Sequence, residues 1–272
     1  MTEPLCVPLR VPDLERSLKL YVHGEEDRFV SAQLRREGLW EPYETSLLCQ
    51  LLQPGDVFVD AGANIGYFSL IGAQRVGVAG AVFAFEPDPG HCRLIRASAA
   101  LNRLAERITV VEAGLAERDG QGQLYLSAEN LGDHQIFTTA EERPCIPISL
   151  CSGADYLRPR VTRMDLLKVD TQGSEWQVMA GLLPLLKELP YPPRVILELT
   201  PFSLREAGSS GRQLVRLLSG ISQDIAIIDH IEHRVVAVTP EALSTWCDNV
   251  DATANDRGFM NILVGKLPAG LA

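Results

Sequence analysis

The stretch that decides the fold is Val57-Phe58-Val59-Asp60-Ala61-Gly62-Ala63-Asn64-Ile65-Gly66-Tyr67-Phe68-Ser69-Leu70. Its first residues are apolar and predict a short buried strand over 57–60, while the apolar pattern after the glycines predicts a helix over 65–76. Glycine and small alanines between the two elements let the backbone turn sharply and approach a ligand closely. The helix also begins with backbone N–H groups that have no partner inside it. This stretch therefore predicts a ligand cradle between a strand and a helix.

The rest of the chain repeats the alternation of strand and helix. Strands are expected over 81–85, 108–111, 166–169 and 195–199, and helices over 90–104, 175–186 and 212–218. Such alternation predicts an α/β fold, Rossmann-like, with a mostly parallel sheet and helices on both faces. Three later strands, over 225–228, 235–238 and 261–264, have a short connection between the first two, which predicts an antiparallel edge. Ligands of such sheets bind outside the carboxyl ends of the strands.

The first 54 residues do not follow this rhythm. They begin with several prolines and contain a helical pattern only over 42–52. We expect residues 1–54 to form an N-terminal helical lid segment and residues 55–272 to form the ligand-binding domain. Short strands over 124–127 and 145–148 around a polar loop predict a hairpin-like insertion over 117–150.

Composition narrows the class of protein. The chain has 272 residues, 46 % of them hydrophobic, and a formal net charge of -10. A chain of this length buries enough surface to fold without disulfides or a structural metal, and the cysteines, which form no C-x-x-C pair, are expected to be reduced. The acidic balance argues against a large nucleic-acid partner. No apolar leader or membrane span is apparent, so the sequence predicts a cytoplasmic protein without a membrane partner.

Acidic residues at the ends of two predicted strands restrict which ligand the cradle could bind. Asp60 ends the first strand, where a dinucleotide site would have glycine beside a pyrophosphate. A carboxylate there would repel a pyrophosphate but suits S-adenosylmethionine, which has an ammonium and a sulfonium group. Glu86 ends the second strand, where a carboxylate can accept hydrogen bonds from both ribose hydroxyls. NAD sites share the second feature, so an NAD-linked oxidoreductase remains an alternative that Asp60 disfavours.

Four stretches in this order resemble the FkbM family of methyltransferases: VFVDAGANIGYFSL, VFAFEPDP, LLKVDTQGSEWQVMAGL and VILELTP. The resemblance covers about residues 28–265, including a lead-in with Gly38, Glu41 and Glu44. It implies a class I methyltransferase fold, S-adenosylmethionine as cofactor with S-adenosylhomocysteine as product, and O-methylation of hydroxyls on sugars or natural products. This chain has Gln172 where family members often have glutamate.

The resemblance also implies roles for individual residues. Those expected to bind the cofactor are Asp60, Gly62, Ala63, Asn64 and Gly66 at the methionine end, Glu86 and Pro87 at the ribose, Glu112 and Gly114 near the adenine, and Asp170 near the sulfur.

Methyl transfer to oxygen requires positioning and removal of the acceptor proton. Three residues are candidate proton acceptors: His134 in the polar insertion, Asp170 at the end of the fourth strand and Glu198 near the end of the fifth. Asp133 beside His134 could raise its basicity. Each has a structural alternative, namely a solvated loop histidine, a helix cap and a strand acid paired with Lys168.

The remaining features leave some alternatives open. No metal is expected, since the His230-Ile231-Glu232-His233 stretch lies in a turn without a third ligand. The predicted partner is a small-molecule acceptor, and a homodimer is one option for the oligomeric state. An N-methyltransferase, a protein or peptide methyltransferase and a non-catalytic S-adenosylmethionine-binding protein remain alternatives to the O-methyltransferase.

Overall fold

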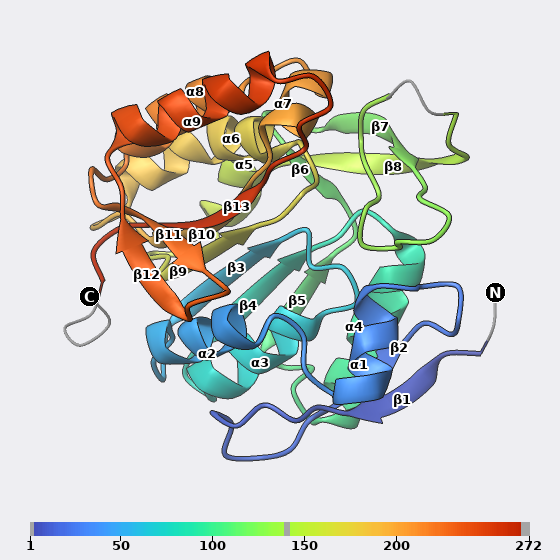
Figure 1. Cartoon of the computed structure of the whole chain (residues 1–272). Coiled ribbons are helices and arrows are strands. Elements are labelled where there is room, and N and C mark those ends of the chain that lie inside the picture. The colour runs from blue at the N-terminus through green and yellow to red at the C-terminus, as the bar shows by residue number, and fades with distance from the viewer. Residues whose placement is uncertain (1–2, 139–141, 268–272) are drawn as a thin grey trace.

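A central sheet of mixed direction organises the computed structural model, which describes residues 3–138 and 142–267 (Figure 1). Within these residues the strand order is β12-β11-β13-β10-β9-β3-β4-β5. The parallel strands are β3 (Val57–Ala61), β4 (Ala81–Phe85), β5 (Ile108–Val111), β9 (Leu166–Val169) and β10 (Arg194–Leu199). The antiparallel edge consists of β13 (Met260–Val264), β11 (Ile225–Asp229) and β12 (Arg234–Ala237). The predicted α/β fold with an antiparallel edge is confirmed.

Successive residues of each strand enter two separate hydrophobic cores, because side chains alternate between the faces of a sheet. Phe58 belongs to one core and Val59 to the other. Helices α2 (Pro42–Leu51), α3 (Tyr67–Val76) and α4 (Pro89–Leu101) cover the first face. Helices α5 (Gly153–Leu157), α6 (Glu175–Glu188), α8 (Gly211–Ser219) and α9 (Pro240–Ala252) cover the second.

The topology of the sheet places the cradle at its centre. From β3 the chain continues outward to β4 and β5, and it then returns to the opposite side of β3 with β9 and β10. The turn after β3 therefore lies where the strand order reverses. In open α/β sheets this is the position at which ligands bind.

The N-terminal segment contains more structure than the sequence predicts. Strands β1 (Leu5–Pro8) and β2 (Lys19–Val22) form an antiparallel pair, and α1 (Val30–Glu37) follows them. The backbone N–H of Tyr21 donates to Ser98 Oγ of α4 at 2.9 Å, and Leu20 and Leu34 are buried in the same core as α3. This segment is thus part of the first core, and its role as a lid stays a prediction.

A second, three-stranded sheet has the order β6-β8-β7, from β6 (Gly114–Ala116), β7 (Gly120–Tyr125) and β8 (Cys145–Ser152). The predicted antiparallel pair is confirmed by β7 and β8, but β7 begins and ends earlier than predicted, β8 extends further, and β6 was not predicted. Residues 139–141 of the predicted insertion, like residues 1–2 and 268–272 of the two predicted domains, lie outside the described residues. In the part of the chain that the structure describes, no helix is both long and apolar enough to cross a bilayer.

Several predicted boundaries are wrong for local reasons. The helix expected from Ile65 begins at Tyr67, because Gly66 is left-handed at φ 87°. The helix expected to continue to Leu104 ends at Leu101, since Asn102 leaves the helical region and Arg103 has φ 59°. Helices α7 (Pro201–Glu206) and α9 were not predicted.

Candidate active site

The cradle after β3 requires glycine at two positions. Gly62 has φ 83°, and a Cβ there would lie 1.9 Å from the carbonyl oxygen of Asp170. At Gly66, with φ 87°, a Cβ would lie 2.9 Å from Cγ1 of Ile95. The backbone N–H groups of Gly62 and Ala63 both donate to the carbonyl oxygen of Phe85 at 3.0 Å, which holds the turn against β4. The turn is therefore packed closely against β4, α4 and the residue that follows β9. Its remaining face is open to a ligand.

Asp60 at the end of β3 is buried and lines neither of the cavities described below. It accepts a hydrogen bond from Ser69 Oγ at 2.5 Å, which ties β3 to α3. Burial raises the pKa of this carboxyl to about 6, although the nearby charge of Lys168 opposes the shift. The expected contact between Asp60 and the cationic end of the cofactor stays a prediction.

Glu86 directly follows β4, and three neighbouring groups hold its carboxylate. Its carboxylate accepts hydrogen bonds from the backbone N–H groups of Asn64 at 2.7 Å and Asp88 at 2.8 Å. The third neighbour is the buried His91, whose Nδ1 lies 3.4 Å from Glu86 Oε1. Burial opposes the charge of His91, but the bond to Glu86 and the negative charge of that carboxylate outweigh it and raise the pKa of the imidazole. The Glu86 carboxylate is thus fixed in orientation at the cradle.

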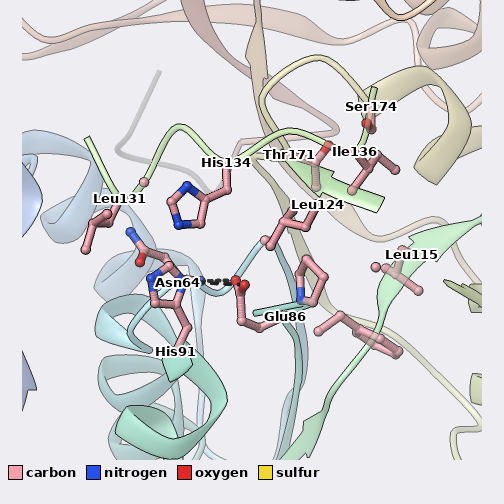
Figure 2. Close-up of a pocket in the computed structure, with 15 residues that line it drawn as sticks. Asn64, Glu86, His91, Leu115, Leu124, Leu131, His134, Ile136, Thr171 and Ser174 are labelled. Atoms are coloured by element: carbon pink, nitrogen blue, oxygen red, sulfur yellow. Dashed lines mark hydrogen bonds and ion pairs between the residues drawn. The ribbon is translucent and has the colours of Figure 1, made fainter. Parts of the chain in front are cut away.

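A first cavity opens above this carboxylate, and we call it the Glu86 cavity (Figure 2). Its lining combines the cradle with the second sheet and the segment that follows β7. The residues are Gly62, Asn64, Phe85, Glu86, Pro87, His91, Gly114, Leu115, Leu124, Leu131, Gly132, His134, Ile136, Thr171 and Ser174.

His134 lies on the wall of the Glu86 cavity. Its ring stacks on His91 with centroids 5.4 Å apart and 5° between the planes, and its Nδ1 accepts from the N–H of Ser127 at 3.1 Å. Burial, reinforced by the charge of His91, lowers its pKa to about 4. The expected support from Asp133 is wrong, because that carboxylate is bound to Arg143 at 2.9 Å. His134 is therefore neutral near pH 7.

The same wall has a possible metal-ligand group. Asp88, His91 and His134 each offer one ligand atom, and these atoms lie within 4.8 Å of one another. Two features oppose an ion in this arrangement. Asp88 already accepts from the first backbone N–H groups of α4. The two rings are also stacked nearly parallel, whereas an ion lies in the plane of each imidazole that binds it.

A second cavity, which we call the Glu198 cavity, lies on the other side of the cradle. Gly62, Asn64 and Gly132 line both cavities, so the two meet at the turn after β3. Its other lining residues are Phe29, Val30, Trp40, Glu41, Ala63, Ile65, Tyr67, Phe68, Asn130, Lys168, Asp170, Gln172, Glu198, Thr200 and Phe259.

Two carboxylates at the ends of adjacent strands face each other across one amide in this cavity. Gln172 Nε2 donates to Asp170 Oδ1 at 2.7 Å and to Glu198 Oε2 at 3.0 Å. Asp170 is also paired with Lys168 Nζ at 3.0 Å. Burial, followed by the negative charge of Asp170, raises the pKa of Glu198 well above its usual value. Glu198 is thus the carboxylate of this pair with the higher affinity for a proton.

The structure separates the predicted site residues into groups. Gly62, Asn64, Glu86, Pro87, Gly114 and His134 line the Glu86 cavity, and Gly62, Ala63, Asn64, Asp170 and Glu198 line the Glu198 cavity. Gly66 caps α3 beneath the turn. The Glu112 side chain points away to Arg96, with Arg96 Nη1 and Glu112 Oε2 2.8 Å apart.

Sequence reasoning missed His91 as a neighbour of Glu86, and Phe29 and Phe259 as cavity residues. His91 had a signal, since it lies one helical turn after Glu86-Pro87-Asp88. Phe29 and Phe259 had none, because they reach one cavity from opposite ends of the chain.

The sequence of this chain is similar to those of known methyltransferases. The sequence pattern of the methyltransferase FkbM domain matches residues 60–234. The chain is 31 % identical over 163 residues to the 31-O-demethyl-FK506 methyltransferase FkbM of Streptomyces tacrolimicus, which covers 48 % of this chain and 61 % of that protein. It is 29 % identical over 150 residues to Methyltransferase 1 of Beauveria bassiana, covering 47 % of this chain and 59 % of the relative.

These matches span about three fifths of the length of each curated relative. Among solved structures, one described as a putative rRNA-methylase from Clostridium thermocellum has a TM-score of 0.47 and 12 % identity, covering 81 % of this chain and 92 % of that one. The family match covers well over half of the chain and includes the cradle, Glu86, Asp170 and Glu198. This chain belongs to the methyltransferase FkbM domain family.

Proposed function

We propose that the chain transfers the methyl group of S-adenosylmethionine to a hydroxyl of a small-molecule acceptor, a sugar or natural product. The observation behind this proposal is the meeting of two cavities at one glycine turn. One cavity ends on a fixed carboxylate suited to a ribose, and the other ends on a pair of carboxylates suited to receive a proton. The name of the Streptomyces tacrolimicus relative, which specifies an O-methyl group, agrees with an oxygen acceptor.

The residues of the Glu86 cavity fit the nucleoside part of the cofactor. Glu86 would accept hydrogen bonds from the ribose hydroxyls, beside Pro87. The backbone from Glu112 to Gly114 would lie along the adenine, between the end of β5 and the second sheet. Gly62 lines both cavities, which fits a ligand lying on the turn. Ala63 and Asn64 line the side toward the second cavity, where the methionine part would lie.

The Glu198 cavity fits the acceptor. When bound, the cofactor supplies an electrophilic methyl group, so the chain has to orient the acceptor oxygen and accept its proton. Glu198 would take this proton, since its raised pKa gives it a higher affinity for protons than an exposed carboxylate. Asp170, neutralised by Lys168, and the Gln172 amide would hold the Glu198 carboxylate in place. His134 lines the other cavity, so we assign it to cofactor binding rather than to proton removal.

Substitution of Glu198 by glutamine tests the assigned proton acceptor. A panel of hydroxyl-bearing sugars and macrolides is incubated with the protein and S-adenosylmethionine, and methylated products are detected by mass spectrometry. Glu198→Gln should lower the turnover of any acceptor by about 10²- to 10⁴-fold, because general-base catalysis contributes on this scale. Calorimetry should find its affinity for S-adenosylhomocysteine within about twofold of wild type, because Glu198 lies outside the Glu86 cavity.

Glu106→Gln is the matched control, since this exposed glutamate lies far from both cavities. Unchanged turnover in Glu198→Gln would exclude Glu198 as the base. A protein that binds S-adenosylmethionine but methylates no hydroxyl in the panel would favour the non-catalytic binding protein.

A further inference from the structure

The Glu198 cavity and its floor contain more carboxylates than cations. Glu41, Asp170 and Glu198 line it, and Glu44 lies directly behind, 3.7 Å from Lys168 Nζ. Among the described residues, Lys168 is the one cation that lines this cavity, and it is already paired with Asp170 at 3.0 Å. It also lies 4.6 Å from the centroid of the Phe68 ring. Lys168 is therefore fully engaged, and the carboxyl groups of this cavity outnumber its cation.

Glu41 is a carboxyl group of this cavity with one unpaired oxygen, although the Asn261 side chain lies close enough to affect its pKa. Its Oε2 is buried and has no hydrogen-bond partner among the described residues. The residue precedes α2, but its side chain does not cap that helix. Its backbone is left-handed at φ 41°, a costly conformation for a residue with a side chain. Burial, followed by the charge of Glu44, raises its pKa to about 8. A buried acceptor without a partner is costly, so this geometry suits a ligand that supplies the missing donor.

Glu41 lies on the acceptor side of the cavity. The groups that face it include Glu44 on α2, Lys168 and Asp170 at the end of β9, and Asn261 on β13. Asn261 pairs in register with Glu198, donates to Glu44 Oε2 at 2.7 Å and lies 3.1 Å from His230 Nε2. In the sheet, β10 and β13 lie two and three strands from β3 on the side opposite β4, where Glu86 ends the strand. Glu41 is thus placed for the acceptor rather than for the nucleoside.

Aromatic rings line the same cavity as this carboxyl group. Trp40, Tyr67 and Phe68 line the cavity, and Phe29 and Phe259 do so while remaining 52 % and 61 % exposed. The hydroxyl of Tyr67 is engaged with the N–H of Trp40 and with Thr45, so its ring is the part available to a ligand. Aromatic faces beside a desolvated carboxylate recognise organic ammonium groups.

We propose that the methyl acceptor carries a protonated amine on an apolar body, and that the Glu41 carboxylate binds this ammonium while the acceptor hydroxyl faces Glu198. This inference rests on the proposed function and narrows its acceptor to amino alcohols, such as amino sugars or amine-bearing natural products. Anionic acceptors, including phosphorylated sugars, would be repelled by the excess carboxylates.

Three probes of the same shape test the charge preference: 2-phenylethylammonium, 2-phenylethanol and phenylacetate. Each is titrated into protein saturated with S-adenosylhomocysteine and followed by saturation-transfer NMR. The ammonium should bind about tenfold or more tightly than the alcohol, because hydrogen bonds to charged groups are stronger than those between neutral groups, and phenylacetate should bind most weakly. In Glu41→Gln the ratio of ammonium to alcohol affinity should fall to near one, while the alcohol affinity stays unchanged.

Glu106→Gln, on an exposed site, should keep the wild-type ratio. Glu41→Asp provides a second variant if the amide perturbs folding, which thermal melting would reveal. It keeps the charge but withdraws it by one methylene, so its ratio should lie between those of wild type and Glu41→Gln.

Three results would overturn the proposal. The alcohol could bind as tightly as the ammonium, Glu41→Gln could keep the full ammonium preference, or no probe could bind the saturated protein. The cofactor has an amine of its own, and calorimetry with S-adenosylhomocysteine tests whether Glu41 binds that amine instead of the acceptor's. If Glu41→Gln weakens that ligand tenfold or more, Glu41 binds the amine of the cofactor and the proposal is wrong. If S-adenosylmethionine does not bind the wild-type protein at all, the proposed function itself fails.

Discussion

Gly62 is one of the two glycines that the cradle requires. At Gly62 the backbone is left-handed and a Cβ would lie 1.9 Å from the Asp170 carbonyl oxygen. We expect Gly62→Ala to lower the free energy of unfolding by more than about 3 kcal/mol, because backbone strain and a clash with rigid backbone add. It should also abolish measurable binding of S-adenosylhomocysteine. Urea unfolding and calorimetry measure the two effects.

Gly55→Ala is the matched control for this substitution. Gly55 has φ 92°, but a Cβ there would meet nothing within 4 Å. It should cost about 1–2 kcal/mol, the price of left-handed backbone alone, and leave the ligand affinity unchanged. Equal losses of stability in the two variants would show that the contact with Asp170 is unimportant.

His91 gives the protein a pH-dependent contribution to stability. The bond to Glu86 raises its pKa above the ordinary value of 6.5, so the folded state holds the proton more tightly than the unfolded state. This contribution is fully present below about pH 6.5 and is lost as pH rises through the raised pKa. The difference in free energy of unfolding between wild type and His91→Asn should therefore be larger at about pH 6 than at about pH 8. A difference that grows with pH would contradict the assigned charge of His91.

At the scale of elements, the central strands could be predicted because they are continuous apolar runs. Strands β4, β5 and β9 have the predicted bounds, since parallel strands covered on both faces have little polar interruption. The β1–β2 pair could not be predicted in this way. Leu20 is fully buried and Leu5 is half exposed, and the partner that buries this pair, α4, lies far along the chain.

The sequence of α9 contains a helical pattern, but the pattern is weak. Leu243, Cys247 and Val250 follow a helical spacing after Thr239, whose side chain caps the helix by accepting from the Ala242 N–H. Apart from Trp246, the residues between them are polar or acidic, so the pattern resembles a solvated loop. Its packing partner is visible only in three dimensions: a Cβ on Gly211 of α8 would lie 2.6 Å from Cys247 Sγ.

The residues of the site also differ in whether their positions could be predicted from the sequence. Gly62, Glu86 and Asp170 could be placed from the sequence because each follows a predictable parallel strand, and such strand ends meet at one edge. The position of His134 relative to Asp170 and Glu198 could not be predicted in this way. It depends on how the segment after β7 folds back over the sheet, where Gln135 and Tyr125 exchange backbone hydrogen bonds.

The segment that carries His134 therefore gives a prediction that separates cofactor binding from chemistry. His134 lines the Glu86 cavity and is neutral near pH 7, since burial lowers its pKa to about 4. His134→Ala should weaken S-adenosylhomocysteine binding about five- to tenfold through lost contact area. The rate of a single turnover at saturating cofactor should change by less than about twofold, because proton removal contributes far more than this. A variant with normal cofactor affinity and slow transfer would restore His134 as the proton acceptor.

At the scale of the whole molecule, charge and topology act together. The net charge of -10 is spread over a protein in which the carboxyl groups of the Glu198 cavity also outnumber its cation. The turn between β3 and α3 has the acidic Asp60 just before it and Glu86 beside it. A cofactor bound there has to place hydroxyls or cationic groups, and not phosphates, against Glu86, while Asp60 is buried and lines neither cavity.

This charge distribution predicts which nucleosides stabilise the fold. S-adenosylhomocysteine at 100 times its Kd should add about 2.7 kcal/mol to the free energy of unfolding, because it binds the folded chain alone. For a chain of this size that corresponds to a rise in Tm of about 5–10 °C. NADH at the same concentration shares the ribose but presents a pyrophosphate to the acidic turn, so it should raise Tm by less than about 1 °C. Thermal unfolding monitored by circular dichroism measures both shifts. A larger shift with NADH would mean that the turn accepts a pyrophosphate despite Asp60 and Glu86, and the assignment of both cavities would then have to change.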